Sequence, residues 1–295
     1  MSRASEDQEE YHVPGLMRPL SALATGSYEP FPRESTVSAD SSPATSVEVD
    51  DVWATLTKDH YALLNDQTIG LPTNFRKSFL GKYFNDQTLR HDKGDWPVDR
   101  KRARDVVEYE WRDDGLHLRE YDKITLIDRG GIPGEREHAR VWLLDDPEAE
   151  QFVRAFLGLV PPDRRQRKGT FGINLFRTFT NVVTKPHHDD EQFIMLYVLD
   201  RIGSGAESYL YDPDDVMDTG RVTAEPRHRH QLNPGQILIF EDRFFKHGAT
   251  PLIAPAGGKA RRDVLVCTVN YPGSYPLDKS SSPSEAAALA GSGMR

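Results

Sequence analysis

The sequence predicts a mainly β fold, an antiparallel sandwich or jelly roll with a layer of flanking helices. Two observations lead to this fold class. Apolar residues recur at helical spacing before residue 100, and from residue 170 onward they form short β-branched or aromatic runs separated by Gly, Pro and Asp. Several short strands that follow helices are typical of a sheet sandwich or jelly roll that carries a helical layer.

Helices are expected within residues 50–85 and at residues 146–160. The first region contains DDVWATLTKDHYALLND, which opens with two aspartates as N-cap candidates, and NFRKSFLGKYF, which repeats the apolar pattern. The second helix lies in DDPEAEQFVRAFLGLV, with Asp146 as N-cap and Pro147 at the first helical position. Its apolar residues follow at i, i+3, i+4, i+7 and i+8, namely Ala149, Phe152, Val153, Phe156 and Leu157.

The strands of the β core are expected at about residues 100–145 and 170–272. In the first part, RDVVEYEWRDDGLHLREYD and ARVWLLDD favour strands, with DRGGIPGE as a loop between them. The second part has five short runs bounded by turn residues, which are FGINLFRTFTNVV, QFIMLYVLD, AESYLYD, GQILIFED and RDVLVCTVNY. These runs are long enough for the strands of one β-rich domain.

The folded part of the chain is predicted to be a single domain spanning residues 49–275. Residues 1–48 and 276–295 are rich in Ser, Pro, Ala and acidic residues and carry few large apolar side chains. Such segments cannot bury enough apolar surface to offset the loss of chain entropy. Both are therefore expected to be disordered tails.

Charge and composition narrow the classes of function. The formal net charge of −9 argues against nucleic acid or an anionic membrane surface as a partner. No run approaches 18 apolar residues, and the first residues lack the apolar segment of a secretory signal, so neither a transmembrane helix nor secretion is expected. The single cysteine, Cys267, excludes an intrachain disulfide and fits a cytoplasmic protein. The oligomeric state does not follow from the sequence.

A cluster of histidines and aspartates precedes the strand QFIMLYVLD. KPHHDD contains two His-x-Asp pairs, His187 with Asp189 and His188 with Asp190, and alternate residues near a strand share a face. A third candidate ligand, His247, follows the strand GQILIFED. Two histidines and one carboxylate form the facial triad of non-haem Fe(II) oxygenases, which leaves three coordination positions open. The residues alone leave both His-x-Asp registers possible.

Three groups of arginines are candidates for binding anions. Arg262 opens the strand RDVLVCTVNY, 15 residues after His247, and would direct a guanidinium into the β core, where a dicarboxylic cosubstrate could pair with it bidentately. Arg177, in NLFRTF, is a candidate for the substrate carboxylate, with a surface position as the alternative. The arginine-rich stretch VDRKRARD, residues 98–105, is expected to be an exposed basic face, with phosphate binding as the alternative.

The order of these motifs resembles the 2-oxoglutarate–Fe(II) dioxygenase family that includes bacterial L-isoleucine 4-hydroxylase. The resemblance covers about residues 100–272 and rests on His187-His188-Asp189, EQFIMLYVLDR, GAESYLYD, NPGQILIFED, His247 and RRDVLVCTVNY. In the family pattern His-x-Asp-Gly-x-x-aromatic, aligning the aromatic residue with Phe193 selects His187 and Asp189. Asp190 then replaces the family glycine, and Ala206 replaces the second glycine of a Gly-Gly-Glu-Ser turn.

This resemblance implies a double-stranded β-helix (jelly-roll, cupin-like) core that binds Fe(II), with 2-oxoglutarate as cosubstrate and O2 as oxidant. The implied metal ligands are His187, Asp189 and His247, and Arg262 would bind 2-oxoglutarate. The implied reaction is hydroxylation of an unactivated C–H bond in a small substrate, most simply a free aliphatic amino acid. Oxidative cyclisation or desaturation in natural-product biosynthesis is the alternative within this class, and a non-catalytic jelly-roll binding protein is the alternative outside it.

Overall fold

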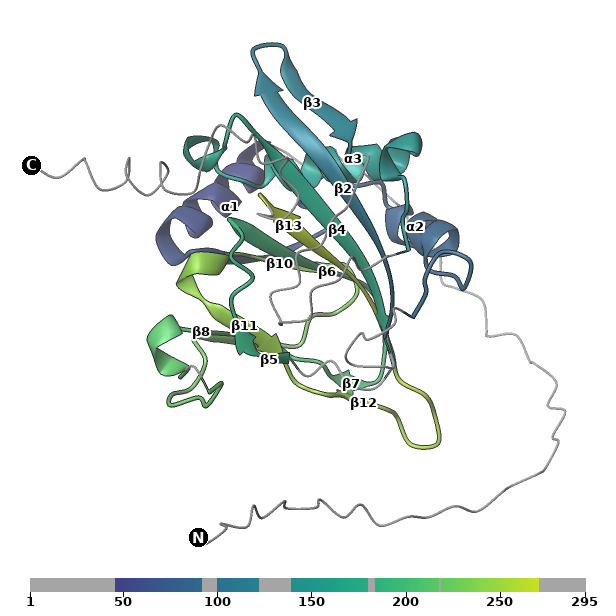
Figure 1. The fold of residues 1–295 in the computed structure, drawn as a ribbon, viewed down its shortest axis with the longest axis vertical. Helices are drawn as coiled ribbons and strands as arrows, with labels where there is room; N and C mark the ends of the chain where they lie inside the picture. Colours follow the sequence, from purple (N-terminus) through teal and green to yellow (C-terminus); the bar gives the residue numbers. More distant parts are fainter. Residues whose placement is uncertain (1–45, 92–99, 122–138, 180–183, 218, 271–295) are drawn as a thin grey trace, which may run out of the picture. The chain divides into compact units, whose positions relative to one another are not determined.

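The computed structural model describes residues 46–91, 100–121, 139–179, 184–217 and 219–270 (Figure 1). The expected tails lie outside these residues, apart from the start of the first helix at Ser46, and so does the expected loop DRGGIPGE. No helix in the described ranges is long and apolar enough to cross a membrane.

The larger of the two main sheets has seven strands, and every neighbouring pair is antiparallel. Strands that are distant in the sequence lie side by side in it. In spatial order they are β1 (Tyr61–Asn65), β10 (Gln236–Glu241), β6 (Phe193–Ile202), β13 (Arg261–Val269), β4 (Lys168–Thr178), β2 (Arg100–Arg112) and β3 (Gly115–Glu120).

A smaller antiparallel sheet faces one side of the larger sheet. Its strands, in spatial order, are β5 (Thr184–His187), β11 (Lys246–Ala249), β8 (Ser208–Tyr211) and β9 (His228–His230). A further short pair is formed by β7 (Ser204–Gly205) and β12 (Leu252–Ile253). Buried apolar side chains join the two main sheets into a sandwich, for example Val198, Phe240 and Val264 from the larger sheet with Leu210 from the smaller one.

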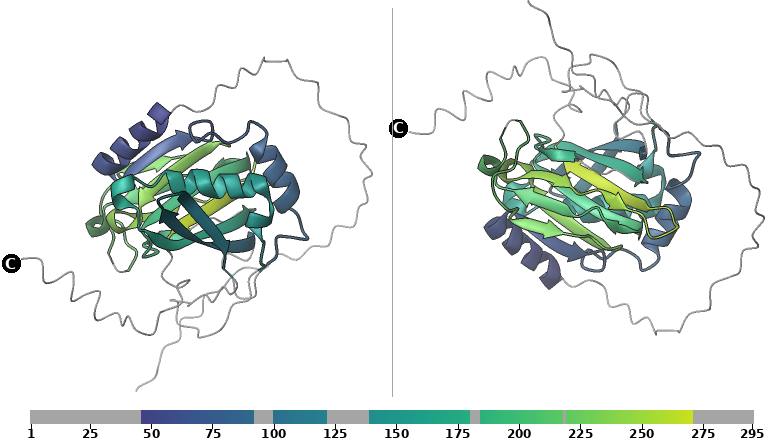
Figure 2. Two further views of the ribbon diagram at one scale, coloured as in Figure 1. Left: turned by 90° about the horizontal axis from the view of Figure 1, so that it is seen from above. Right: turned by 90° about the horizontal axis from the view of Figure 1, so that it is seen from below.

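Three helices cover the other side of the larger sheet (Figure 2). They are α1 (Ser46–Asp59), α2 (Phe75–Tyr83) and α3 (Pro147–Gly158), and short 3-10 turns occur at η1 (Leu143–Asp145), η2 (Pro162–Arg164), η3 (Pro213–Asp215) and η4 (Asp242–Phe244). Phe152 and Phe156 of α3 pack on Tyr197 of β6, with ring centroids 6.4 and 5.7 Å apart. Each aromatic side chain fully buried here contributes about 1.5–3 kcal/mol.

The helix α3 confirms the local prediction for DDPEAEQFVRAFLGLV. The Asp146 side chain accepts a hydrogen bond from the Glu148 N–H at 3.0 Å, and Pro147 opens the helix. The five residues predicted for its apolar face are all buried. An N-cap of this kind contributes about 1 kcal/mol, so the sequence specifies the start of this helix locally.

The stretch YALLN departs from the helical prediction for residues 50–85. Residues 61–65 form the edge strand β1, which pairs with β10, and helix α1 has already ended at Asp59. Burial alternates along the strand, so that Leu64 is buried and Leu63 is 40% exposed. Pairing with the open edge of the sheet satisfies the backbone of these residues and outweighs their helical spacing.

Alternation along the strands divides the larger sheet into a helix-facing side and a sandwich-facing side. In β4, Phe171, Ile173 and Leu175 belong to the core beneath the helices. The intervening residues Asn174 and Phe176 line a cavity between the two sheets instead. The same alternation in β2, β6 and β13 decides which side chains reach this cavity.

Candidate metal centre

The cavity between the sheets has a volume of about 360 Å³ and is lined by polar and apolar side chains from both sheets. The smaller sheet and the loop after β5 contribute two histidines, an aspartate and a glutamate. The larger sheet contributes arginines and apolar residues. The polar lining residues include Arg100, Arg102, Arg104, Asn174, Thr178, His187, Asp189, Glu191, Ser208, His247, Arg262 and Thr268.

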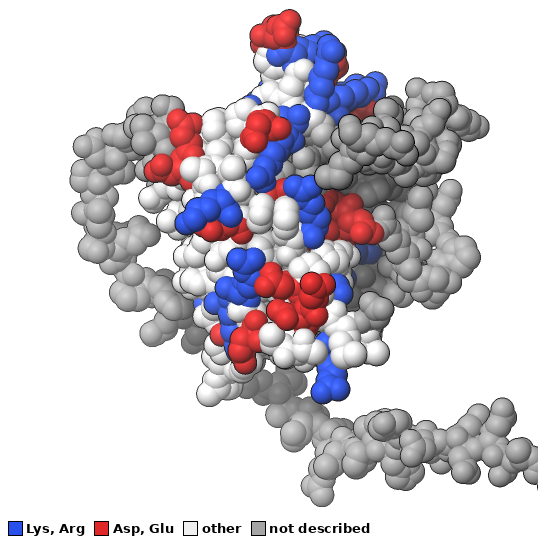
Figure 3. Space-filling view, turned by 90° about the vertical axis from the view of Figure 1, so that its left-hand side faces the viewer, with Lys and Arg blue, Asp and Glu red and all other residues white. Residues whose placement is uncertain are grey.

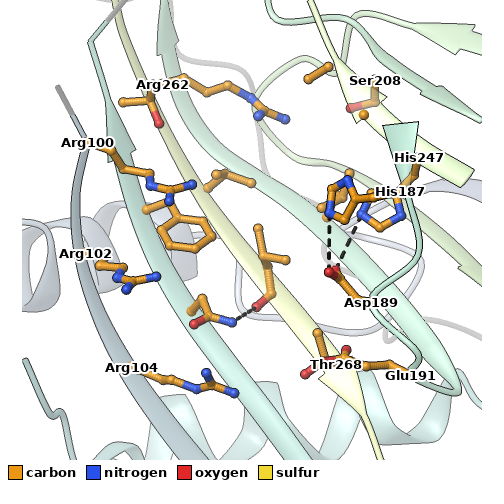
Figure 4. Close-up of a pocket in the computed structure, with 18 residues that line it drawn as sticks. Arg100, Arg102, Arg104, His187, Asp189, Glu191, Ser208, His247, Arg262 and Thr268 are labelled. Atoms are coloured by element: carbon orange, nitrogen blue, oxygen red, sulfur yellow. Dashed lines mark hydrogen bonds and ion pairs between the residues drawn. The ribbon is translucent and has the colours of Figure 1, made fainter. Parts of the chain in front are cut away.

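His187, Asp189 and His247 converge at one end of the cavity (Figure 4). His187 ends β5 and is directly opposite His247 in β11, and their ring centroids are 4.5 Å apart. The Asp189 carboxylate is 3.3 Å from Nε2 of His187 and 3.5 Å from Nε2 of His247. One potential ligand atom from each residue lies within 4.8 Å of the others.

This arrangement fits a divalent metal ion. Ligand atoms at about 2 Å from one ion lie roughly 3 Å or more from each other, which matches the separations of the three side chains. The set of two imidazoles and one carboxylate on one side of an open cavity is the facial triad. Among the described residues, no other group of three or more His, Cys, Asp or Glu side chains has this metal-binding geometry.

Polar groups outside the triad lie beside Nδ1 of both histidines. Nδ1 of His187 contacts the carbonyl oxygen of Lys185 at 2.8 Å, so its Nε2 faces Asp189. Nδ1 of His247 faces Oδ1 of Asp242 at 3.5 Å. Despite the opposing effect of burial, Asp189 and Asp242 raise the pKa of His247 to about 9. Burial also opposes ionisation of Asp189, but hydrogen bonds from His187 and His247 bring its pKa well below the usual range.

Asp242 is a residue of this site that the sequence did not reveal. It is 1% exposed, and its Oδ2 accepts hydrogen bonds from the backbone N–H groups of Asp189 at 2.9 Å and Glu191 at 3.2 Å. Asp242 therefore fixes the loop that carries one candidate ligand and also faces the ring of another, His247. The only signal in the sequence is an acidic residue directly after the strand GQILIFE.

The alternative register, His188 with Asp190, does not reach this convergence point. Nδ1 of His188 donates to the carbonyl oxygen of Asp242 at 2.7 Å. Asp190 is exposed and has a φ of +60°, in the left-handed region that favours glycine. Ala206, which also stands where the resembled family has glycine, has a φ of +49°. The backbone thus retains a glycine-like conformation at both positions.

Arg262 lies in the cavity, whereas Arg177 does not. Arg262 is 4% exposed, its Nη2 has no hydrogen-bond partner among the described residues, and burial followed by repulsion from Arg201 lowers its pKa to about 10. Such a buried, orphaned guanidinium fits the distal carboxylate of a dicarboxylic cosubstrate. Arg177 is on the opposite face of β4, in a forked ion pair with Asp263 at 2.7 and 2.8 Å, so the expectation that it faces the substrate is wrong.

The expectation of an exposed basic face at VDRKRARD is also wrong for the described part of this stretch. Arg102 and Arg104 are buried, and together with Arg100 they line the cavity. Lys101, which lies between Arg100 and Arg102 in the sequence, points to the other side of β2 and pairs with Asp86. The sequence could not distinguish an exposed face from a cavity-lining face, because charged residues can alternate with other residues in both kinds of strand.

Comparisons with known proteins agree with this geometry. Residues 51–268 match the family model described as 2OG-Fe dioxygenase, in which 2OG stands for 2-oxoglutarate. No curated protein matches the chain.

Among solved structures, a bsmA homolog from Methylobium petroleophilum PM1 is 19% identical, with a TM-score of 0.59 over 75% of this chain and 92% of its own. IDO from Bacillus thuringiensis is 15% identical, with a TM-score of 0.55 over 76% of this chain and 98% of its own. The Fe(II)/(alpha)ketoglutarate-dependent dioxygenase TqaL is 12% identical, with a TM-score of 0.57 over 76% and 87%. At these identities they show the fold, and they confirm the predicted jelly-roll core with flanking helices.

Proposed function

This chain belongs to the 2OG-Fe dioxygenase family, and from that premise we propose that it hydroxylates an aliphatic side-chain carbon of a free amino acid. Membership of the family makes the protein an enzyme that uses Fe(II) and 2-oxoglutarate. A free amino acid is supported by the resemblance of its motifs to the group that includes L-isoleucine 4-hydroxylase. The cavity volume of about 360 Å³ also suits a small substrate.

The observation that carries the proposal is the convergence of His187, Asp189 and His247 at one end of the cavity. These three side chains would hold the iron. When bound, the iron and 2-oxoglutarate supply the activation of O2 that oxidises an unactivated C–H bond. The role of the chain itself is to fix the ligand set and to hold the substrate carbon close to it.

Arg262 would bind the distal carboxylate of 2-oxoglutarate. Its guanidinium is buried in β13 and reaches into the cavity on which the metal ligands also border (Figure 4). A forked guanidinium–carboxylate contact fixes both the position and the orientation of the cosubstrate. The apolar side chains of Leu196, Val264 and Val266 form part of the cavity wall and would exclude water around an aliphatic substrate carbon.

The reaction is tested by loading the purified enzyme with Fe(II) and 2-oxoglutarate without oxygen, and then adding O2 with a pool of amino acids. Succinate formed in a substrate-dependent way, with a product heavier by one oxygen atom, is the expected result. A product lighter by two hydrogens would instead establish desaturation or cyclisation. No substrate-dependent succinate with any amino acid would overturn the proposed substrate class.

The ligand assignment is tested by a matched pair of variants. His187→Ala should abolish iron binding and turnover, whereas His188→Ala should retain most of the iron because its ring bonds to a backbone carbonyl instead. Iron content is measured after anaerobic reconstitution and desalting. Loss of iron in His188→Ala, with normal binding in His187→Ala, would show that the alternative register is the correct one.

A further inference from the structure

Two buried polar side chains in the cavity wall have hydrogen-bonding capacity that the described residues leave unused. Glu191, in the loop between β5 and β6, is 8% exposed, and Thr268, near the end of β13, is 3% exposed. Both line the cavity. Oε2 of Glu191 and Oγ1 of Thr268 have no hydrogen-bond partner among the described residues. A buried oxygen without a partner costs about 1–3 kcal/mol, so two of them in a cavity wall indicate a ligand that donates to them.

The backbone brings these two side chains together from distant parts of the chain. The Glu191 N–H donates to Oδ2 of Asp242 at 3.2 Å, and the next N–H, of Gln192, donates to the carbonyl oxygen of Val269 at 3.0 Å. The loop that carries Glu191 is therefore tied to the end of β13, one residue beyond Thr268. In Figure 4 the two side chains lie next to each other, although the hydroxyl is not in hydrogen-bonding geometry with the carboxyl.

Gly172 in β4 leaves the space that the Thr268 hydroxyl occupies. The two residues are in register between β4 and β13. A Cβ at position 172 would lie 2.7 Å from Oγ1 of Thr268, so a larger residue would displace the hydroxyl. A glycine inside a strand often marks such a close approach. The hydroxyl thus lies against bare backbone on one side and faces the cavity on the other.

The pair is separate from the proposed cosubstrate anchor. Arg262, Val264, Val266 and Thr268 alternate along β13 and all line the cavity. The backbone rises about 20 Å from Arg262 to Thr268. In Figure 4 the three candidate metal ligands lie between Arg262 and the pair. A cosubstrate that reaches from Arg262 to the metal would therefore leave Glu191 and Thr268 to the substrate.

The surroundings of Glu191 differ from those of carboxylates on the surface. Acidic and basic side chains are intermixed on the face in Figure 3. Elsewhere in the described structure, Glu207 pairs with Arg229 at 2.7 Å. Oε2 of Glu191 is enclosed instead, and a cation, Arg104, and an anion, Asp189, both act on this carboxyl. What this end of the cavity offers is therefore a place for hydrogen-bond donors rather than an excess of one charge.

We propose that Glu191 and Thr268 bind the α-ammonium group of the substrate. This inference rests on the proposed function and deepens it, because it makes a free amino group a requirement for binding. An ammonium group has three N–H donors and can serve both oxygens at once, whereas a hydroxyl group has only one donor. Val266 is the neighbouring cavity-lining residue of β13, so an aliphatic chain anchored at the pair would lie over it, towards the metal ligands.

The ligand requirement is tested with molecules that differ only in the group proposed to be bound. Valine, leucine and isoleucine are each compared with the α-hydroxy acid of the same carbon skeleton and with the acid that is unsubstituted at this carbon. Each is titrated without oxygen into the enzyme holding Fe(II) and saturating 2-oxoglutarate, and binding is followed by the change in the metal-to-ligand charge-transfer band. At least one amino acid should bind tenfold or more tightly than its unsubstituted acid, with the α-hydroxy acid between them. Equal affinities within all three sets would overturn the inference.

Two variants assign the preference to these side chains. Glu191→Gln and Thr268→Val nearly preserve side-chain volume, and each should reduce the affinity ratio of amino acid to unsubstituted acid at least fivefold. The melting temperature of the ligand-free enzyme should not fall in Thr268→Val, because this hydroxyl has no hydrogen bond to lose among the described residues. Iron content should stay near that of the wild type in both variants. A ratio that survives in both would overturn the assignment.

Glu207→Gln is the matched control for Glu191→Gln. Glu207 precedes the cavity-lining Ser208, but its own carboxylate pairs with Arg229 and does not line the cavity. The affinity ratio should therefore keep its wild-type value in this variant. An equal loss in Glu207→Gln would show that the preference does not come from the pair in the cavity.

Failure of this inference can be told apart from failure of the proposed function. If amino acids are oxidised with succinate formation but bind no more tightly than the unsubstituted acids, the reaction stands and the ammonium site is overturned. If no amino acid binds, isoamylamine is compared with isoamyl alcohol. A preference for the amine that is lost in Glu191→Gln would support the ammonium site and overturn the amino acid reaction, and no preference would overturn both.

Discussion

At the scale of single residues, the face of a strand on which a side chain lies decides its role in this molecule. Arg262 is buried in the cavity, while its neighbour Arg261 forms an ion pair with Asp200 on the other face of β13. In β2, Arg102 lines the cavity and Lys101 points away from it. Neighbouring residues of the same charge therefore serve as matched controls for one another.

Replacing Arg262 tests its proposed contact with the cosubstrate. Arg262→Ala should weaken 2-oxoglutarate binding about a hundredfold, equivalent to ~2.7 kcal/mol, because it would remove one partner of the proposed buried ion pair. Arg262→Lys should recover only part of this loss, since an ammonium cannot form the fork. The measurement is anaerobic titration of the Fe(II) enzyme with 2-oxoglutarate.

Arg261→Ala should leave the 2-oxoglutarate affinity within about twofold of wild type. Iron content should remain near that of the wild type in both arginine variants, because neither residue borders the three candidate ligands. An equal loss of 2-oxoglutarate affinity in Arg261→Ala would mean that the wrong arginine has been assigned.

Asp242 is expected to tune the metal centre without binding the metal. Asp242→Asn keeps an oxygen that can accept from the N–H groups of Asp189 and Glu191 but removes the negative charge beside Nδ1 of His247. Loss of such an outer carboxylate typically weakens metal binding 10- to 100-fold. Anaerobic titration with Fe(II) measures the affinity. The exposed Asp190→Asn, at a φ that asparagine tolerates, is the control and should bind iron normally.

Sequence alone could identify only those candidate site residues that belong to a spaced motif. His187, Asp189 and His247 could be proposed because metal chemistry requires their residue types at strand ends. Asp242 has no such signature, since it acts through backbone N–H groups of a loop that is distant in the sequence. The pairing of Arg177 with Asp263 depends on the register between β4 and β13, which no local pattern contains.

At the scale of elements, the sequence predicts secondary structure best where interactions within one segment determine it. Helix α3 has its own cap and its own apolar face, and it was predicted nearly to the residue. Strand β1 does not follow from its own sequence, because its apolar residues fit a helix as well as a strand and only pairing with the edge of β10 selects the strand. The burial of Arg102 and Arg104 in β2 does not follow from the local sequence, because the smaller sheet across the cavity begins 80 residues or more further along the chain.

A buried acid pair connects the elements β2, β3 and η1, and should make their stability depend on pH. Arg140 contacts Asp105 at 3.0 Å and Glu120 at 3.3 Å, while the two carboxylates accept N–H groups of Leu143 and Leu144. Burial, and then the charge of Asp105, raise the pKa of Glu120 to about 7 from an ordinary value of 4.5. Between these two pH values the folded protein keeps a proton that the unfolded chain has lost.

The stabilisation from this proton is complete below about pH 4.5 and is lost as the pH rises through 7. The free energy of unfolding should therefore fall by at most about 1.4 kcal/mol per pH unit from this group. Urea unfolding between pH 5 and 8 measures how steeply the free energy of unfolding falls with pH. This slope should be shallower in Glu120→Gln. Glu110→Gln, which changes a carboxylate paired with Arg112 on the same hairpin, should keep the wild-type slope. A Glu120→Gln slope equal to that of the wild type would contradict the assignment.

At the scale of the whole molecule, the two sheets contribute different parts of the site. The smaller sheet carries both histidines of the candidate metal centre. The larger sheet carries Arg262 and the cavity-lining residues Arg100, Arg102 and Arg104. Iron would therefore bind on one side of the sandwich, and 2-oxoglutarate would span from the iron to the other side. Binding of the two together should stabilise the packing of the sheets, and 2-oxoglutarate should do so only when the metal is present.

Thermal unfolding of the metal-free enzyme tests this coupling. A ligand at a hundred times its Kd stabilises the folded state by about 2.7 kcal/mol, which raises the melting temperature of a domain of this size by roughly 5–10 °C. Fe(II) added without oxygen should produce such a rise, and 2-oxoglutarate should add a further rise only after Fe(II). His247→Ala should lose both rises, whereas Arg262→Ala should keep the first and lose the second. An equal effect of 2-oxoglutarate with and without metal would show that the cosubstrate does not bridge the two sheets through the iron.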